Sequence, residues 1–332
     1  MKIFISGICG VLGSTLAKHF IDKGYKVSGN DKVRIEEAWR LEGYKDKISY
    51  LWKSSMDLTW DDFFIGTLKE DGGFADVVID CALESADRPF GIYSPRQTLI
   101  GNLFVPLGVL EAIKNISKDY TPIIIYPSSF NVFYGHKYGT ILSESVPPKT
   151  SSLYGWTKLA AEELYMAYYK AYGIPIIITR VGSAFGPTMR SDELVGRLII
   201  HCLLNKDFRL RSPKAKRLWC YTQDVIDFYD KLIPTSKKYI GQILHCGGNL
   251  NDEIVENWQL AERIKELTDS DISIEPTDYE PGEMIDGKPI DFKVDSSYTK
   301  RLLKWEPKYS LNEGLKETVE WFKKNLWRYS VR

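Results

Sequence analysis

The chain has 332 residues, 44% of them hydrophobic, which is enough for a sizeable core in one large unit or two domains. Its 44 basic and 44 acidic residues balance, so nothing indicates nucleic acid or a membrane surface as a partner. No apolar stretch is long enough to span a bilayer or to form a signal peptide, and the five cysteines and four histidines show no metal-ligand spacing. We therefore expect a cytoplasmic protein with reduced cysteines and no metal site.

The N-terminal apolar run leads directly into a glycine-rich turn and then into helix-favouring residues. A strand, a glycine turn and a helix start form the context of a dinucleotide site, because glycines let the backbone approach a pyrophosphate and the helix N-terminus offers free N–H groups. The spacing here is Gly-x-x-Gly-x-x-Gly, and a tight turn without a ligand is the alternative. The residues predicted to bind the cofactor at this turn are Gly7, Gly10, Val11, Leu12 and Gly13.

Asp31 ends a second strand, predicted at residues 25–31. A carboxylate about twenty residues beyond the glycines accepts hydrogen bonds from the adenosine ribose and repels a 2′-phosphate, so it favours NAD over NADP. Lys32 and Arg34 keep NADP open, because a neighbouring base accommodates that phosphate. An aspartate that caps the next helix is the alternative.

Strand-like and helix-like segments alternate through the first half of the chain. Further strands are predicted at residues 48–51, 76–82, 122–126 and 175–179, with helices between 51 and 76, at 98–115 and at 154–172. This alternation predicts an α/β fold of Rossmann type, a doubly wound parallel sheet covered on both faces. Later helices are predicted at 193–205, 223–233, 257–267 and 311–326, and a strand at 242–246. We assign residues 1–185 to the dinucleotide-binding domain, with the strand at 242–246 returning to it, and residues 186–332 mainly to a smaller substrate-binding lobe.

Tyr154 and Lys158 are four residues apart in one of these helices and therefore share a face. An ammonium group beside a phenol favours the phenolate and lowers the pKa of the phenol, so the pair is a candidate acid–base device near neutral pH. A packed tyrosine with a solvated lysine beyond it is the alternative.

With the glycine turn, Asp31 and the Tyr154/Lys158 pair in this order, the chain resembles the extended short-chain dehydrogenase/reductase family, and most of all its nucleotide-sugar epimerase/dehydratase branch. The resemblance covers nearly the whole chain. It continues through Asp57-Leu58, the strand at 78–83, the helix that follows Asn102, Ser128-Ser129, Arg180, Phe185-Gly186-Pro187, Arg217, Asp224-Val225 and the C-terminal segment 303–315.

The resemblance implies NAD as cofactor and a homodimer formed through the helix after Asn102 and the helix of Tyr154. Besides the turn and Asp31, it assigns to the cofactor Asp57, Leu58, Cys81, Ala82, Leu83, Asn102, Tyr154 and Lys158. For Asn102, Glu144, Arg180 and Asp224, packing or capping is an equal alternative. The helix residues Ala160, Ala161, Tyr165, Met166 and Tyr169 form either the dimer face or part of the core.

The chemistry implied by the resemblance centres on three residues. Tyr154 as phenolate takes the proton from a sugar hydroxyl while NAD takes the hydride from the same carbon. Lys158 holds the phenolate charge and binds the nicotinamide ribose, and Ser129 hydrogen-bonds the reacting oxygen. The loop after Ser129 is one residue longer than in the family, which leaves open whether Ser128 or Ser129 faces the substrate.

The expected substrate is a nucleotide sugar. Arg217 is a candidate for its diphosphate, because a planar guanidinium grips two phosphate oxygens, and a salt-bridged surface arginine is the alternative. Ser183 stands where the family places an asparagine that contacts the diphosphate. Glu84, just beyond the cofactor strand, is a candidate for the sugar pocket, with a solvated loop charge as the alternative.

The residues after Ser129 bear on the reaction. Dehydratases and decarboxylases of the family carry an acid there, whereas this chain has Phe130-Asn131. The sequence therefore predicts an NAD-dependent epimerase, similar to UDP-glucose/galactose 4-epimerases, that oxidises a nucleotide sugar transiently to a keto-sugar. A reductase or dehydrogenase using NAD(P) on a sugar nucleotide or natural product is the alternative, followed by a dehydratase and by a non-catalytic NAD-binding protein.

Overall fold

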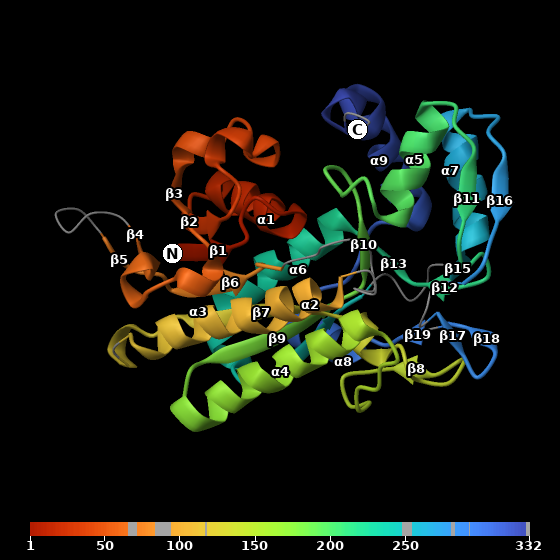
Figure 1. The fold of residues 1–332 in the computed structure, drawn as a ribbon. Helices are drawn as coiled ribbons and strands as arrows, with labels where there is room; N and C mark the ends of the chain where they lie inside the picture. Colours follow the sequence, from red (N-terminus) through yellow and green to blue (C-terminus); the bar gives the residue numbers. More distant parts are fainter. Residues whose placement is uncertain are drawn as a thin grey trace.

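A computed structural model describes residues 1–65, 72–83, 94–116, 118–247, 254–279, 283–291 and 293–329. At the centre of this part of the chain lies a seven-stranded sheet whose neighbouring strands all run parallel (Figure 1). In order across the sheet, the strands are β14 (Ile243–Cys246), β9 (Ile176–Val181), β7 (Ile123–Ser129), β6 (Val77–Asp80), β1 (Lys2–Ser6), β2 (Lys26–Asp31) and β3 (Ile48–Trp52). The order reverses between β1 and β6, so the predicted Rossmann-type fold is confirmed, and ligands of such sheets bind at that reversal.

Helices cover both faces of the sheet because the strands are apolar on both sides. On one face, Ile3 and Ile5 of β1 pack in the core that holds α1 (Val11–Asp22) and α6 (Thr222–Thr235). On the other face, Phe4 packs in the core that holds α3 (Val105–Lys114) and α4 (Leu153–Tyr172). The later-coming α6 and β14 thus belong to the sheet layer, while the domain division at residue 185 stays a prediction.

A separate lobe lies at the right of Figure 1 and has its own apolar core. It is built on α5 (Leu194–Leu203), α7 (Asn257–Thr268) and α9 (Leu311–Asn325), with β11 (Phe208–Leu210) paired to β16 (Ile274–Pro276). The remaining described elements are β4 (Phe64–Ile65), β5 (Gly73–Phe74), α2 (Pro95–Leu99), β8 (Ile141–Leu142), β10 (Ser183–Phe185), β12 (Lys216–Arg217), β13 (Trp219–Tyr221), β15 (Val255–Glu256), β17 (Met284–Ile285), β18 (Lys288–Pro289), β19 (Lys293–Val294) and α8 (Ser297–Leu303). No helix in the described ranges is both long enough and apolar enough to cross a membrane.

The helix predicted at residues 98–115 has a wide turn in its middle. Between α2 and α3, Ile100–Phe104 forms a π-helical turn. Pro106 follows this turn and has no N–H with which to continue the regular hydrogen-bond ladder, so the helix widens there. The turn places Asn102 against α4.

The helix predicted between residues 51 and 76 is wrong for the described part of that segment. Two short 3-10 turns, Ser55–Asp57 and Trp60–Phe63, occupy it instead. Ser54 Oγ accepts the N–H of Met56 in the first turn, and the N–H of Thr59 donates to the Asp62 carboxylate in the second. Such local bonds favour separate turns over one continuous helix.

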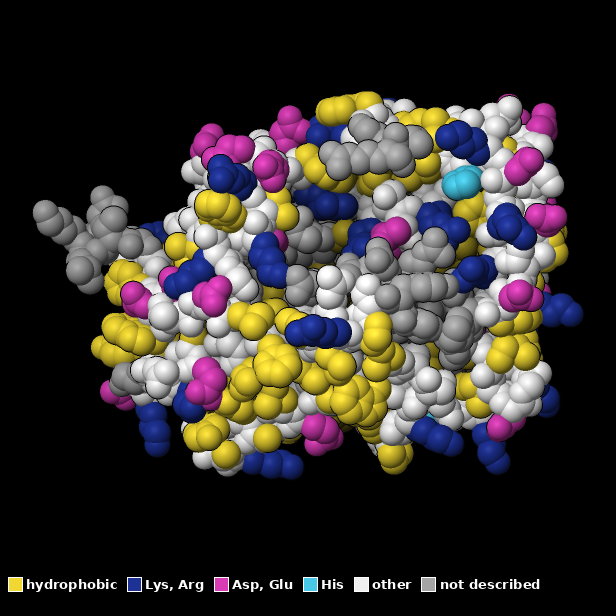
Figure 2. Space-filling view, viewed as in Figure 1, with side chains coloured by type: hydrophobic (Ala, Val, Ile, Leu, Met, Phe, Trp, Pro, Cys, Tyr) yellow, Lys and Arg dark blue, Asp and Glu magenta, His cyan; other side chains and the backbone are white. Residues whose placement is uncertain are grey.

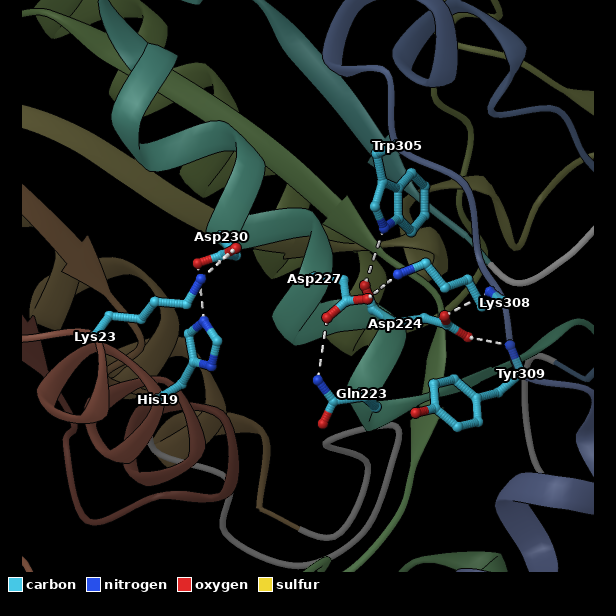
Figure 3. A network of polar contacts seen from close by, with 9 residues as sticks. All are labelled: His19, Lys23, Gln223, Asp224, Asp227, Asp230, Trp305, Lys308 and Tyr309. Carbon is cyan, nitrogen blue, oxygen red and sulfur yellow. Dashed lines mark hydrogen bonds and ion pairs between the residues drawn. The ribbon is translucent and has the colours of Figure 1, made fainter.

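Polar contacts of α6 join the N-terminal and C-terminal parts of the sheet layer (Figure 3). Asp230 pairs with His19 of α1 at 2.9 Å and with Lys23, the C-cap of that helix, at 3.2 Å. Asp224 accepts the backbone N–H of Lys308 at 2.7 Å. Asp224 is also 1% exposed, so the capping alternative applies to it rather than ligand contact.

Candidate active site

The glycine turn between β1 and α1 is shaped by close backbone contacts. Gly7 has a φ of +65°, and a Cβ on it would lie 2.7 Å from the Cα of Ala82. A Cβ on Gly13 would lie 2.4 Å from the carbonyl oxygen of Gly7. Gly10 precedes α1 and offers no side chain to its first N–H groups, which stay available to an anion. This cradle fits the pyrophosphate of a dinucleotide.

Asp31 is fixed beside this turn. Its carboxylate oxygens accept the backbone N–H of Cys9 at 3.0 Å and of Val33 at 3.2 Å. The next short 3-10 turn is preceded by Arg34 as its N-cap, so Asp31 does not cap it. The guanidinium of Arg34 lies over the ring of Trp52, 4.3 Å from its centre. Asp31 is therefore held at the end of β2 in the position expected for a ribose-binding carboxylate.

The other predicted cofactor residues lie in two places. Cys81, Ala82 and Leu83 directly follow β6, next to the glycine turn and at the reversal of the sheet. Asp57 is exposed at the end of a 3-10 turn, whereas the side chain of Leu58 is buried in the core under α3. Contact of Asp57 and Leu58 with an adenine stays a prediction.

Asn102 connects the π-helical turn to the helix of Tyr154. Its Nδ2 donates to Thr157 Oγ1 at 2.9 Å, and Thr157 Oγ1 donates to the carbonyl of Tyr154. Asn102 Oδ1 is buried and has no hydrogen-bond partner among the described residues. It therefore positions the first turn of α4 and presents one acceptor that a bound cofactor can satisfy.

Tyr154 lies in the first turn of α4, against the loop that follows β7. Ser152 Oγ caps this helix by accepting the N–H of Gly155 at 3.0 Å. A Cβ on Gly155 would lie 2.2 Å from the carbonyl oxygen of Asn131, so only glycine allows this close approach. The approach brings Tyr154 toward Ser129 at the carboxyl end of β7, and Ser129 is among the groups that lower the pKa of Tyr154.

The two neighbouring serines have different partners. Ser128 Oγ donates to Glu162 Oε1 at 2.5 Å on the buried side of α4. Ser129 Oγ bonds to Asn131 and faces Tyr154. The loop after Ser129 begins with the 3-10 turn Phe130–Phe133. Ser129 is therefore the serine on the side of Tyr154, and its contact with a substrate oxygen stays a prediction.

Glu162 and Arg180 form a buried ion pair at 2.7 Å, with both side chains no more than 3% exposed. The Arg180 guanidinium also lies over the ring of Phe133. Glu144 accepts the hydroxyl of Thr299 at 2.6 Å. Arg180 and Glu144 thus take the packing roles that the sequence left as alternatives.

The electrostatics of the pair differ from the sequence expectation. Burial raises the pKa of Tyr154, and Glu193 raises it further, while Arg190 and the hydrogen bond with Ser129 lower it. Burial lowers the pKa of Lys158 to about 8. Lys158 Nζ donates to the hydroxyl of Tyr126 at 3.1 Å and to a backbone carbonyl at 2.9 Å. The sequence predicted that Lys158 lowers the pKa of Tyr154. For the chain alone the pKa of Tyr154 is instead raised, because desolvation outweighs the groups that favour the phenolate.

Two charged residues that act on Tyr154, Arg190 and Glu193, were missed by sequence reasoning. Arg190 binds Asp192 through Nε at 2.7 Å and through Nη2. Glu193 is the N-cap of α5 but its side chain makes no capping bond, and burial raises its pKa to about 7. In sequence they look like solvated loop charges, and only the fold brings them to Tyr154. Figure 2 shows a hollow between the N-terminal half and the lobe, lined by Lys and Arg side chains with an acid among them.

The structure describes only two of the three residues predicted to bind the sugar nucleotide. Arg217 of β12 makes an ion pair with Glu283, which is buried, and no partner within the described ranges reaches Arg217 Nε. Ser183 is half-buried at the start of β10, opposite Trp219. Glu84 lies outside the described residues. Substrate contacts by these residues stay predictions.

Comparison with known proteins supplies the family. The sequence model described as the NAD dependent epimerase/dehydratase family matches residues 3–247. A dTDP-glucose 4,6-dehydratase of Xanthomonas campestris pv. campestris is 24% identical over 97% of this chain and 93% of that protein. UDP-glucuronic acid decarboxylase 5 of Arabidopsis thaliana is 27% identical over 98% of this chain and 90% of that protein.

A solved structure gives the same picture. The crystal structure of UDP-glucuronic acid 4-epimerase from Bacillus cereus, in complex with UDP-glucuronic acid and NAD, superposes with a TM-score of 0.83. The two sequences are 25% identical, with 98% of this chain and 99% of that chain covered. These relatives catalyse different reactions, while the NAD cradle described above is the part that a shared cofactor requires. The chain belongs to the NAD dependent epimerase/dehydratase family.

Proposed function

We propose that this protein is a nucleotide-sugar epimerase that uses tightly held NAD. The observation that carries the proposal is the sequence after Ser129. Ser129 faces Tyr154, and the residues that directly follow it carry no carboxyl group. Phe130 is 7% exposed and packs in a small core, and Asn131 offers an amide that bonds to Ser129. Elimination or decarboxylation of a sugar needs a proton moved at a second carbon, whereas epimerisation needs acid–base chemistry at one.

The chain's own residues have distinct tasks in this reaction. Tyr154 removes the proton from the sugar hydroxyl and later returns it, with Ser129 as a hydrogen-bond donor to the same oxygen. Lys158 supplies a positive charge behind the pair. NAD, when bound, accepts the hydride from the sugar carbon and gives it back. The keto-sugar rotates within the site, so that the hydride returns to its opposite face. This inverts the carbon without net production of NADH.

The test is incubation of the purified protein with a panel of nucleotide sugars, with products separated by chromatography and absorbance followed at the NADH band. The proposal expects an isomer of one substrate and no lasting absorbance change. Stoichiometric turnover of added NAD(P)H would instead support the reductase or dehydrogenase. A mass spectrum of the protein as purified identifies the cofactor independently.

A dehydratase is the second candidate, because one observation favours it. Glu193 is a carboxyl group that acts on Tyr154 electrostatically, and its pKa of about 7 suits a general acid at neutral pH. The Glu193 side chain is free of a capping role at α5. A product lighter by one water molecule, lost when Glu193 is changed to Gln, would identify this reaction.

We also propose a homodimer through α3 and α4. Figure 2 shows a hydrophobic patch over these helices. Phe104, which ends the π-helical turn before α3, and Trp156 of α4 are 53% and 50% exposed. Of the helix residues considered for such a face, Ala161 and Tyr165 lie in the core. Light scattering after size-exclusion chromatography tests this, and Phe104→Glu is expected to yield a monomer.

A further inference from the structure

A fully buried carboxyl group lies beneath the predicted acid–base pair. Asp80 ends β6 and is 1% exposed. One of its oxygens accepts from Ser6 Oγ and the other from the hydroxyl of Tyr165. The proposed reaction leaves this acid without a role.

Asp80 accepts hydrogen bonds through both of its carboxyl oxygens. Ser6 Oγ accepts the N–H of Ala82 at 3.2 Å, so its one proton points to the carboxyl group. The proton of Tyr165 also goes to this group. Both carboxyl oxygens are therefore acceptors, which is the pattern of an ionised carboxylate. Burial raises the pKa of Asp80, and these two hydroxyls together with Lys158 oppose that rise.

The neighbouring buried acid differs from Asp80 in its partner. Glu162 holds Arg180 through Nε and Nη2 at 3.0 Å and 2.7 Å, which balances its charge locally. Asp80 has no such arginine in contact among the described residues, and the cation that acts on it is Lys158. The charge of Asp80 is therefore not balanced by a closer basic group, as that of Glu162 is by Arg180.

Two stacked tyrosines connect Asp80 to Lys158. The rings of Tyr165 and Tyr126 stack with centres 4.4 Å apart and an interplanar angle of 23°. Lys158 Nζ donates to the Tyr126 hydroxyl and lies 4.7 Å from the centre of its ring. The ammonium group, the two aromatic rings and the carboxylate thus form a continuous buried arrangement from α4 to the end of β6.

An ammonium group buried without a counter-charge loses its proton easily, because desolvation disfavours the charged form. Three groups besides Tyr126 face Lys158, namely Asp80, Cys81 and Glu162. Burial raises the pKa of the Cys81 thiol, so it stays uncharged at neutral pH, and Glu162 is balanced by Arg180. Asp80 is the remaining anion.

We propose that Asp80 is a positioning residue of the active site, a buried anion held by Tyr165 that attracts the Lys158 ammonium across the Tyr165/Tyr126 stack and keeps it charged and in place behind Tyr154. The inference rests on the proposed function only in taking Tyr154 and Lys158 as the acid–base pair. It assigns to Asp80 no contact with the substrate or the cofactor.

The test is the titration of Lys158 in the full-length, NAD-bound protein by NMR of 15N-labelled lysine side chains. The Lys158 signal is assigned by its loss in Lys158→Met. Asp80→Asn is expected to lower the pH midpoint of this signal by about one unit or more, because an opposite charge has been removed. The alkaline limb of the pH–rate profile is expected to move to lower pH in the same variant.

A second variant guards against misfolding. Tyr165→Phe keeps the stacked ring and the Asp80 carboxylate and removes one donor, so it is expected to lower the Lys158 midpoint by a smaller amount. Ser128→Ala is the matched control, since it removes a donor from Glu162 and is expected to leave the midpoint in place. If Asp80→Asn does not fold, Tyr165→Phe decides alone.

An unchanged Lys158 midpoint in the folded variants overturns the inference. A lowered midpoint in a protein that converts no nucleotide sugar keeps the inference and removes the proposed function. If the protein is an active epimerase and Asp80→Asn leaves the pH midpoint of Lys158 unchanged, the proposed function stands and the inference is wrong.

Discussion

The cofactor side and the sugar side of the site are built differently. The cofactor side consists of backbone at the ends of β1, β2 and β6, where glycines leave no space for a side chain. The side proposed for the sugar includes Arg217, whose side chain already has a charged partner in Glu283, and Arg190 near Tyr154 is likewise paired with Asp192. The glycine turn leaves little freedom for substitution, whereas the charged side chains could exchange partners when a ligand binds.

The largest effect is expected on the cofactor side. Gly13→Val places a side chain where even a Cβ lies 2.4 Å from the Gly7 carbonyl oxygen, so we expect complete loss of bound NAD and of activity. The measurement is the NAD content of the purified variant. Gly10→Ala is the graded control, because its Cβ would lie 3.2 Å from the same oxygen, and it is expected to lose less. Full NAD content in Gly13→Val would contradict the cradle.

The next effect tests the residue that joins the two sides. Tyr154→Phe removes the acid–base group and is expected to lower kcat by about 10²- to 10⁴-fold. NAD content is expected to remain normal, since the turn is untouched. A variant that keeps its rate within tenfold would exclude Tyr154 from the chemistry.

The two serines after β7 separate chemistry from packing. Ser129→Ala is expected to lower the rate roughly tenfold to a hundredfold, the size of one hydrogen bond to a developing charge. Ser128→Ala is expected to keep the rate and to lower the free energy of unfolding by about 1–3 kcal/mol, because Glu162 loses a donor. Rate measurements and thermal melts of both variants decide, and exchanged phenotypes would reverse our assignment.

Glu193→Gln tests the charge next to Tyr154. An ionised Glu193 disfavours the phenolate, so its removal is expected to lower the pKa of Tyr154 and to move the rise of rate to lower pH. The difference is expected from near pH 7 upward, where Glu193 is ionised in the wild type. The rate at its optimum should change less than about tenfold. A far larger loss would favour the dehydratase.

The smallest effect is expected at Arg217. Glu283→Gln removes the carboxylate that competes with a diphosphate for the guanidinium, so UDP or dTDP is expected to bind a few-fold more tightly by calorimetry. Arg217→Gln is the matched variant and is expected to weaken binding. Unchanged affinity in both would place the diphosphate elsewhere.

The sequence predicted the parts of the site that depend on local pattern. The glycine turn, Asp31 and the Tyr154/Lys158 spacing each follow from neighbouring residues, and the structure places them at one edge of the sheet. The roles proposed for Glu193 and Asp80 were missed, because they depend on which distant elements pack beside these residues. The helix predicted after β3 is wrong for a local reason. Hydrogen bonds within the segment, at Ser54 and at Thr59, divide it into two separate turns.

The most direct test of the epimerase is the fate of deuterium placed on the sugar carbon that is oxidised. An epimerase returns the same hydride, so the account predicts an isomer that keeps its deuterium on that carbon and has an unchanged mass. Deuterium found in released NADH, on another carbon of a product lighter by water, or in a product lighter by carbon dioxide would contradict it.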